Sequence, residues 1–214
     1  MRIAFIGTSH AARHLSMAAR LKGFELVAAG EGDLTFVSED TPTDERGKRD
    51  LNVIRGLVAE ARKYDAPIIL TSAVPPGFTR SLGFQLWHQA ETLRMRDAEE
   101  RAINPEMIIV GADDPGLPLP KAYETYLRSF KCPRLIMTWE EAEFSKMAIN
   151  CILASQVECA NDLSAAAKKV GASWRAIKEV LRHDSRIGPY AYLEPGDWKR
   201  SRHLVRDMRT LLEI

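Results

Sequence analysis

Short apolar runs alternate with amphipathic stretches through the first 137 residues of the chain. Each run is predominantly apolar, as a strand buried on both faces requires, while the stretches between the runs repeat apolar residues at helical spacing. The predicted strands are Arg2–Ile6, Glu25–Ala29, Leu34–Val37, Pro67–Leu70, Met107–Val110 and Leu135–Met137. The predicted helices are His14–Leu21, Leu51–Tyr64, Phe78–Glu100 and Leu117–Phe130. This alternation predicts an α/β fold with a Rossmann-like parallel sheet.

A different pattern begins at Glu140. Residues Glu140–Val170 contain neither proline nor glycine, are rich in alanine and carry little charge in their middle. The pattern predicts one long buried helix, because the run far exceeds the mean helix length of about 11–12 residues. We expect this helix to be the spine of a second domain and the interface of a homodimer.

Two shorter helices are predicted after Gly171, over Trp174–Arg182 and Trp198–Leu212. Ser173 is a suitable N-cap for the first of them. The chain is therefore expected to divide into a Rossmann-like domain at residues 1–137 and a small all-helical domain at residues 138–214.

The composition argues against several classes of protein. Thirty Lys and Arg residues against 29 Asp and Glu give a net charge of +1, which disfavours nucleic acid or an anionic membrane as the main partner. No apolar run approaches the ~18 residues of a membrane span, and the N-terminal apolar run is too short for a signal sequence, so we expect the cytoplasm. Cys132, Cys151 and Cys159 are too few and too scattered for a disulfide framework, and we expect no metal site.

The residues after the first predicted strand have the spacing of a phosphate-binding turn. Gly7-Thr8-Ser9-His10-Ala11-Ala12 aligns with G-x-G-x-x-G, in which glycines let a pyrophosphate approach a helix N-terminus. Gly7 is kept, whereas Ser9 and Ala12 occupy the other glycine positions. Glu31 is the candidate for the acidic residue that binds the ribose about 20 residues further on. On spacing alone, a bound dinucleotide and a Rossmann-like shell with a degenerate site are equally open.

Further motifs follow in a recognisable order. They are Thr41-Pro42-Thr43-Asp44, Ser72-Ala73-Val74-Pro75-Pro76-Gly77, Asn104-Pro105-Glu106, Ile109-Val110-Gly111-Ala112-Asp113-Asp114-Pro115, Glu141-Ala142-Glu143-Phe144-Ser145-Lys146-Met147-Ala148-Ile149-Asn150, Asn161 and Asp184-Ser185-Arg186-Ile187-Gly188-Pro189. Together with the turn at Gly7, this series resembles the UDP-glucose/GDP-mannose dehydrogenase family of NAD-dependent nucleotide-sugar oxidoreductases. The E-A-E-x-x-K-x-x-x-N stretch and the V-P-P-G turn are the most specific parts of the match.

The resemblance implies an NAD-binding domain joined by a long helix to a helical domain that dimerises. The cofactor-binding residues that it implies are Gly7, Thr8, Ser9, His10, Ala11, Ala12, Glu31, Thr41, Pro42 and Ser72.

The resemblance also implies catalytic roles. Lys146 is matched to an amine that stabilises the developing oxyanion, and Asn150 to a side chain that positions a catalytic water. The two lie one helical turn apart, so their polar tips project toward one site. Glu106 is matched to a glutamate near the sugar, and Asp207 to a carboxylate at the end of a catalytic loop. Without the neighbouring motifs, a polar stripe on a helix would be the simpler interpretation of Lys146 and Asn150.

The chain departs from the family pattern where the chemistry needs a thiol. The family carries its nucleophilic cysteine in a glycine-rich loop, and this chain has Pro195–Asp207 there, with His203 at the cysteine position. An imidazole cannot form the thiohemiacetal and thioester of a two-step oxidation. We keep His203 as a candidate substrate contact beside Arg186, which is matched to an arginine supplied across the dimer. A block next to Glu31 is also absent, so the Rossmann-like sheet is expected to be reduced.

Two functions are compatible with these patterns. The leading hypothesis is an NAD-dependent oxidoreductase that removes a single hydride from the CH–OH group of a sugar or nucleotide-sugar. Retention of Lys146 and Asn150 favours it. The competing hypothesis is a catalytically inactive, dimeric binding protein that keeps the dehydrogenase scaffold, which the lost glycines and the missing thiol favour.

Overall fold

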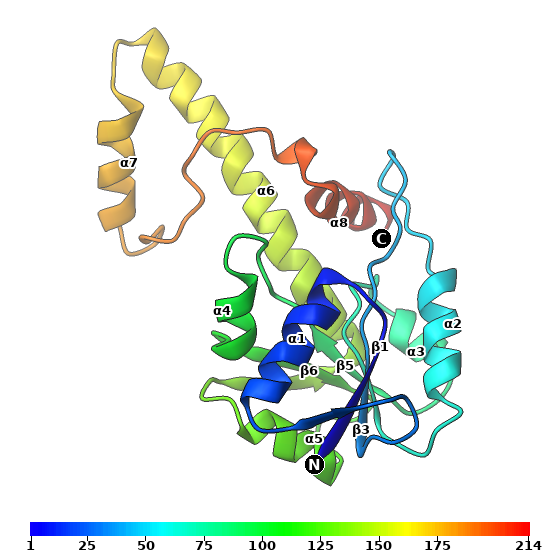
Figure 1. Ribbon diagram of the computed structural model, residues 1–214. Helices are drawn as coiled ribbons and strands as arrows, with labels where there is room; N and C mark the ends of the chain where they lie inside the picture. The colour runs from blue at the N-terminus through cyan, green and yellow to red at the C-terminus, as the bar shows by residue number, and fades with distance from the viewer. The chain divides into compact units, whose positions relative to one another are not determined.

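The computed structural model describes residues 1–214, and its N-terminal part is built on a seven-stranded sheet (Figure 1). The strands are β1 (Arg2–Ile6), β2 (Glu25–Val27), β3 (Leu34–Val37), β4 (Ile68–Leu70), β5 (Trp87–Ala90), β6 (Ile108–Ala112) and β7 (Arg134–Thr138). They lie in the order β2-β1-β3-β4-β5-β6-β7. Neighbouring strands pair in parallel except for β5 and β6, which are antiparallel. The predicted Rossmann-like sheet is confirmed, with one reversal that the sequence did not predict.

Helices cover both faces of this sheet. The helices of this part of the chain are α1 (His10–Leu21), α2 (Asn52–Ala61), α3 (Phe78–Ser81), α4 (Ala98–Ile103) and α5 (Lys121–Arg128). The chain then continues with α6 (Trp139–Lys169), α7 (Trp174–His183), the 3-10 helix η1 (Trp198–Arg200) and α8 (Arg202–Glu213). One core cluster joins the strands to α1 and α5, and the other joins them to α2 and α3.

The period of two along each strand explains the two clusters. Phe36 of β3 packs in the cluster with Tyr126 of α5, and its neighbour Val37 packs in the cluster with Ile54 of α2. Adjacent residues therefore point to opposite faces, and both faces are buried, as a sheet with helices on each side requires.

The predicted helix over Phe78–Glu100 is wrong. The structure has the short α3 at its start, the strand β5 in its middle and a loop that leads into α4. Gly77 and Gly83 flank α3 with φ of +86° and +74°, a region that favours glycine and stops helix propagation. His88 and Gln89 of β5 are buried polar residues, so they do not show the continuous apolar run by which a buried strand is predicted.

The chain forms two compact units. One comprises Met1–Pro42 and Arg49–Lys146, and the other comprises Thr43–Lys48 and Met147–Ile214. The predicted domain boundary lies at Met137, before α6, whereas the units divide within α6 at Lys146.

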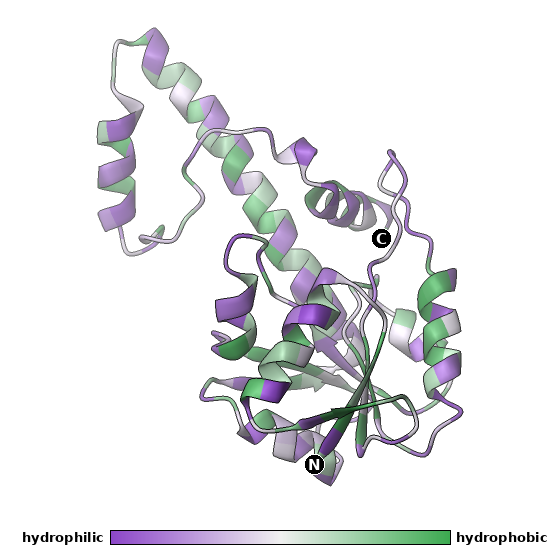
Figure 2. Cartoon of the chain, in the orientation of Figure 1, coloured by the Kyte–Doolittle hydropathy of each residue, from purple (hydrophilic) through white to green (hydrophobic).

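The second unit contains the rest of α6 with α7, η1 and α8. The middle of α6 carries mainly apolar residues (Figure 2). Two of its apolar side chains are nevertheless exposed to solvent, Ile152 by 59% and Leu163 by 46%. The predicted helix Trp198–Leu212 is interrupted at Ser201, so η1 and α8 are separate.

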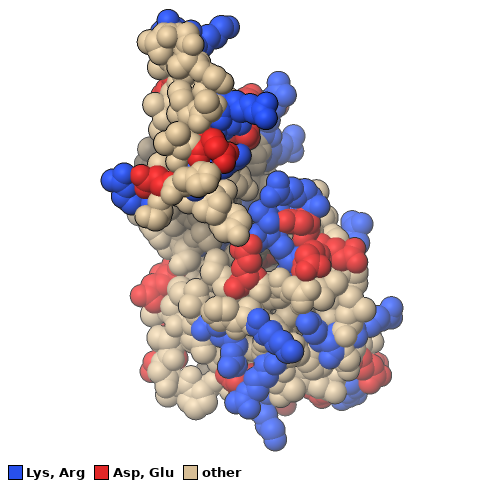
Figure 3. Space-filling view, turned by 90° about the vertical axis from the view of Figure 1, so that its left-hand side faces the viewer, with Lys and Arg blue, Asp and Glu red and all other residues tan.

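Charged side chains of both signs are spread over the surface. On the face drawn in Figure 3, Lys and Arg side chains lie among Asp and Glu side chains, as expected from a net charge of +1. No helix combines the length and the apolar character needed to cross a membrane.

Candidate functional site

The carboxyl ends of β1, β3 and β4 meet at one edge of the sheet. β1 lies between β2 and β3, so the direction in which strands are added reverses there, and open α/β sheets bind ligands at such a point. Gly7 follows β1 with φ of +116°, and a Cβ on it would meet the Ser38 carbonyl oxygen at 2.2 Å. Only glycine permits this close approach of the turn to the residue after β3.

Ser9 stands at a position where the dinucleotide fingerprint has glycine. Its side chain is the N-cap of α1: Oγ accepts a hydrogen bond from the Ala12 N–H at 3.0 Å, and the hydroxyl donates to the Ser38 carbonyl oxygen at 3.0 Å. Ser9 is 5% exposed. The hydroxyl is therefore engaged with the protein itself.

Glu39 is a site residue that sequence reasoning missed. Its Oε2 accepts the Thr8 N–H at 2.7 Å and the Thr8 hydroxyl at 3.2 Å, while its Oε1 accepts the Asp40 N–H at 2.9 Å. Partial burial raises the pKa of Glu39, but the hydrogen bonds from Thr8 and Asp40 outweigh burial, and the pKa lies below its ordinary value. An ionised carboxylate therefore binds a backbone N–H of the phosphate turn at neutral pH. Glu39 lies two residues after the end of β3, and no local pattern in the sequence indicated its contact with Thr8.

Other predicted cofactor-binding residues lie at the same edge. Ser72 is buried and its Oγ accepts the Glu39 N–H at 2.9 Å, and Thr41 is buried with its hydroxyl donating to the Ala73 carbonyl oxygen at 3.2 Å. Pro42 follows Thr41 and is exposed. Glu31 is exposed, beyond the end of β2, and its backbone N–H bonds the Ala28 carbonyl.

Two histidines face each other at the start of α1. His10 is the first residue of the helix, and its Nε2 lies 3.1 Å from the Nε2 of His14. Both side chains are half-buried. Burial, followed by the influence of His10, lowers the pKa of His14. The expectation of no metal site overlooked the H-x3-H spacing of this pair, although no group of three or more ligating side chains is arranged to hold a metal ion.

Lys146 and Asn150 lie on α6 as predicted, one turn apart. Asn150 is 7% exposed, and its Nδ2 donates to Oδ2 of Asp207, 1% exposed, at 2.6 Å. Oδ1 of Asp207 accepts from Nε of the buried Arg206 at 3.1 Å. Two of the predicted catalytic residues are thus in direct contact, and the buried carboxylate has a cation and an amide as partners. Lys146 is half-buried.

The remaining predicted residues are exposed. Glu106 is exposed and accepts from the Arg101 guanidinium at 2.6 Å. Arg186 donates to its neighbour Asp184 at 2.7 Å and 3.0 Å, and this contact lowers the pKa of Asp184. His203 is exposed in the first turn of α8, so the residue at the family's cysteine position is on a helix and not in a glycine-rich loop.

Glu91 is a second residue that sequence reasoning missed, because β5 was predicted as helix. It directly follows β5, is half-buried and lines a small cavity together with Arg101. Since β5 runs parallel to β4, Glu91 lies at the same carboxyl edge of the sheet as the phosphate turn. The sequence analysis placed β5 in the predicted helix Phe78–Glu100, so it did not identify Glu91 as a residue at the carboxyl end of a strand.

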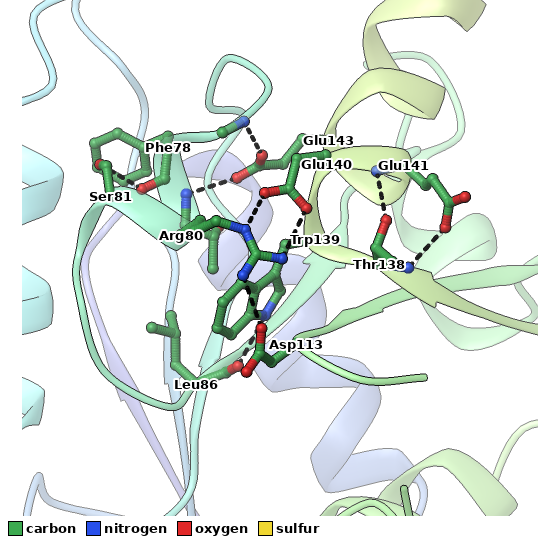
Figure 4. Close-up of polar contacts among 12 residues, drawn as sticks. Phe78, Arg80, Ser81, Leu86, Asp113, Thr138, Trp139, Glu140, Glu141 and Glu143 are labelled. Carbon is green, nitrogen blue, oxygen red and sulfur yellow. Dashed lines mark hydrogen bonds and ion pairs between the residues drawn. The ribbon is translucent and has the colours of Figure 1, made fainter. Parts of the chain in front are cut away.

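The start of α6 is anchored by a buried carboxylate (Figure 4). Glu143 is 1% exposed and accepts the N–H groups of Gly77 and Thr79 at 2.6 Å and 2.8 Å. Burial raises the pKa of Glu143 above its ordinary value. Nearby, the Arg80 guanidinium pairs with Glu140 and Asp113 and lies over the Trp139 ring. The V-P-P-G turn and the E-A-E stretch, the two most specific motifs, are therefore in direct contact.

Comparisons with known proteins agree with this architecture. Residues 140–213 match the model of the UDP-glucose/GDP-mannose dehydrogenase family, central domain. UDP-glucose 6-dehydrogenase AglM of Haloferax volcanii is 31% identical over 188 residues, which are 77% of this chain and 44% of that protein. UDP-glucose 6-dehydrogenase of Rickettsia typhi is 26% identical over 175 residues, covering 73% of this chain and 39% of that protein. The chain thus spans about two fifths of the length of these curated relatives.

A solved structure shows the same fold. The UDP-glucose dehydrogenase of Pyrobaculum islandicum superposes with a TM-score of 0.77 at 20% identity, over 99% of this chain and 64% of that one. The chain is thus a relative of the UDP-glucose/GDP-mannose dehydrogenase family and carries the family's central domain at residues 140–213.

Proposed function

We propose that the chain is a dehydrogenase-type oxidoreductase that binds NAD at the Gly7–Ala12 turn and removes one hydride from a CH–OH group of a sugar or nucleotide-sugar. The observation that carries this proposal is the buried Asn150–Asp207 hydrogen bond of 2.6 Å, with Lys146 one turn earlier on α6. A buried carboxylate such as Asp207 lowers stability unless it is paired and hydrogen-bonded, and apolar residues at these positions would stabilise the fold equally well. The presence of the polar pair therefore favours a functional role over a purely structural one.

The turn suits a pyrophosphate on one condition. Gly7 keeps the close backbone approach, and the turn leads into the N-terminus of α1, where anions are stabilised. Thr8, however, already donates its N–H to Glu39. A phosphate oxygen can take this N–H only after the Glu39 side chain has moved away.

The chemistry assigned to the chain's own residues is a single oxidation. When bound, NAD accepts the hydride. The Lys146 ammonium donates a hydrogen bond to the substrate oxygen as its proton leaves, which stabilises the developing negative charge. A carboxylate accepts that proton, and the product is a carbonyl group. We assign this role to Glu91 ahead of Glu106, because Glu91 is half-buried at the carboxyl edge while Glu106 is exposed and paired with Arg101. No thiol stands at the position of His203, so we propose no second oxidation.

The protein is proposed to act as a homodimer through the helix at residues 140–170. Support comes from the apolar side chains Ile152 and Leu163, which α6 exposes to solvent. Arg186, which is exposed and carries only a local ion pair with Asp184, is proposed as the substrate contact offered to the partner subunit.

A second candidate function is a catalytically inactive binding protein on the same scaffold. The Glu39 carboxylate on the Thr8 N–H favours it, because a negative charge at this point repels phosphate. The replacement of a glycine-rich loop by η1 and α8 also favours it.

Two measurements on the full chain separate the candidates. Thermal unfolding with increasing NAD tests binding, because a ligand that binds only the folded state raises the melting temperature. Absorbance of NADH is then followed with a panel of UDP- and GDP-sugars. Lys146→Ala is expected to lower turnover about 10²–10³-fold while leaving the NAD-dependent stabilisation intact, and Lys169→Ala, at the exposed end of α6, serves as control.

Turnover that depends on Lys146 supports the oxidoreductase. NAD stabilisation without turnover supports the inactive binding protein, and absence of both effects contradicts NAD binding altogether. Glu91→Gln and Glu106→Gln compare the two carboxylates, and a greater loss of turnover for Glu106→Gln would reverse our assignment.

A further inference from the structure

His10, which lies in the proposed NAD-binding turn, forms a side-chain contact with His14 that the proposed hydride transfer does not use. They are four residues apart on α1, the spacing that places two side chains one above the other on the same helix face. Their ring centroids are 4.3 Å apart, and the Nε2 atoms face each other at 3.1 Å. One Nε2–H therefore donates to the unprotonated Nε2 of the other ring.

The separation of the two nitrogens matches a shared metal ion. A late transition metal binds imidazole nitrogen at about 2.0–2.1 Å. Two such ligands on one ion are then separated by about 2.9 Å at a 90° angle and by about 3.4 Å at the tetrahedral angle. The observed 3.1 Å lies between these values, so the two nitrogens already have the separation that a shared ion requires.

We propose that His10 and His14 chelate a divalent late first-row transition metal ion, of which Zn²⁺, Ni²⁺ and Cu²⁺ are the preferred members. Imidazole suits these metals, and Cu²⁺ binds most tightly among them. The two histidines supply two ligands, because no third ligating group is gathered there. The other coordination positions are left to water or to an anionic ligand, so the site is open and not a closed structural one.

Near the histidine pair, one feature opposes the binding of a cation and another favours it. The N-terminus of α1 carries partial positive charge, which opposes a cation by roughly 0.3–1 kcal/mol. The carboxylate of Glu99, in the first turn of α4, is close enough to act on His14 in the opposite sense. Helices α1 and α4 pack against each other, so this carboxylate stays beside the pair.

The test is a calorimetric titration of the tag-free full chain with ZnCl₂ and, separately, with NiCl₂. One ion per chain is expected to bind the wild type. His10→Gln and His14→Gln are each expected to weaken binding at least tenfold. His183→Gln, which removes an exposed histidine at the end of α7, is expected to bind as the wild type does. His10 belongs to the Gly7–Ala12 turn, but the titration contains neither NAD nor a substrate, so metal binding is measured separately from the proposed oxidoreductase activity.

A second measurement guards against variants that fail to fold. In the ¹⁵N spectrum of histidine-labelled wild type, zinc is expected to shift the Nε2 signals of two histidines together at one equivalent. The proposal is overturned if only one histidine responds, if no histidine responds, or if His14→Gln with a wild-type melting curve binds zinc as tightly as the wild type.

Discussion

At the scale of single residues, Glu39 is the acidic side chain that contacts the Gly7–Ala12 turn, the proposed phosphate site. Its carboxylate accepts the Thr8 N–H at 2.7 Å, so a phosphate must compete with a charge that is part of the protein. Glu39→Gln keeps an acceptor oxygen for Thr8 but removes the negative charge. We expect this variant to bind NAD up to about tenfold more tightly, which corresponds to about 1.4 kcal/mol.

Calorimetry of NAD binding to wild type and Glu39→Gln checks this expectation. Glu45→Gln, on an exposed loop, makes the same chemical change away from the turn and is expected to leave the affinity unchanged. Weaker NAD binding by Glu39→Gln would mean that the carboxylate contacts the ligand and does not exclude it.

Asn150 is the second residue whose replacement gives a sharp prediction. Asn150→Asp places a second carboxylate against Asp207, at the 2.6 Å distance now bridged by Nδ2–H. We expect a loss of unfolding free energy of about 3–5 kcal/mol at neutral pH, because a buried charge loses its partner and meets a like charge. The loss should shrink in acid, where one of the two carboxyls binds a proton that both can share.

Urea denaturation at several pH values measures this effect. Gln156→Glu makes the same amide-to-carboxylate change on α6, where the side chain accepts the Tyr192 N–H, and should cost little. Equal stability of Asn150→Asp and wild type at neutral pH would show that the Asn150–Asp207 contact does not form in solution.

These two residues also show what a sequence can predict about a site. The i, i+4 spacing from Lys146 marked Asn150, and the resemblance marked Asp207, so both residues could be named from the sequence. Their hydrogen bond joins positions 57 residues apart on α6 and α8, and no local spacing predicts it. The role of Glu39 depends on β3 lying beside β1, with Ser38 close to Gly7. That approach is a tertiary contact, and no local pattern around Glu39 contains it.

At the scale of elements, β5 is where prediction from the sequence failed. The strands β1, β3 and β4 are predominantly apolar and were predicted nearly to their ends. β5 instead carries His88 and Gln89, both buried, and Tyr123 donates to Gln89 at 3.0 Å. A buried polar side chain such as Gln89, whose partner Tyr123 lies on α5, cannot be distinguished from an exposed one in the sequence. Because β5 was predicted as part of a helix, neither the position of Glu91 at the end of a strand nor the antiparallel pairing of β5 with β6 could be predicted.

His88 of β5 makes the stability of the sheet depend on pH. Burial lowers the pKa of His88 from 6.5 to about 4, so the folded state resists its protonation while the unfolded state does not. The stability conferred by the neutral ring is therefore fully present above pH 6.5 and is lost as the pH falls through 4, by about 3 kcal/mol in all.

Replacement of the ring tests this dependence. Between pH 7 and pH 4, His88→Leu should lose about 3 kcal/mol less unfolding free energy than the wild type, as measured by urea denaturation. The exposed His183 has no such environment, so His183→Leu should follow the wild-type pH profile. Parallel profiles for His88→Leu and wild type would contradict the burial of His88.

At the scale of the whole molecule, α6 links the two compact units and exposes apolar side chains in the second one. Ile152 on α6 is 59% exposed, and burying such a side chain fully stabilises an interface by about 1.5–3 kcal/mol. If the chain dimerises through this helix, Ile152→Asp removes that gain in both subunits and adds a like-charge pair near the symmetry axis. We expect the variant to be monomeric where the wild type is dimeric. Because Ile152 is exposed within one chain, the monomer should keep its helical content.

Sedimentation velocity at several protein concentrations measures this shift, with circular dichroism to check folding. Val180→Asp on α7 replaces a side chain that is 71% exposed and should leave the association constant unchanged. A wild type that is monomeric at all concentrations, or a dimer that Ile152→Asp does not weaken, would exclude α6 as the interface. A dimer disrupted by Val180→Asp alone would instead assign the contact to α7.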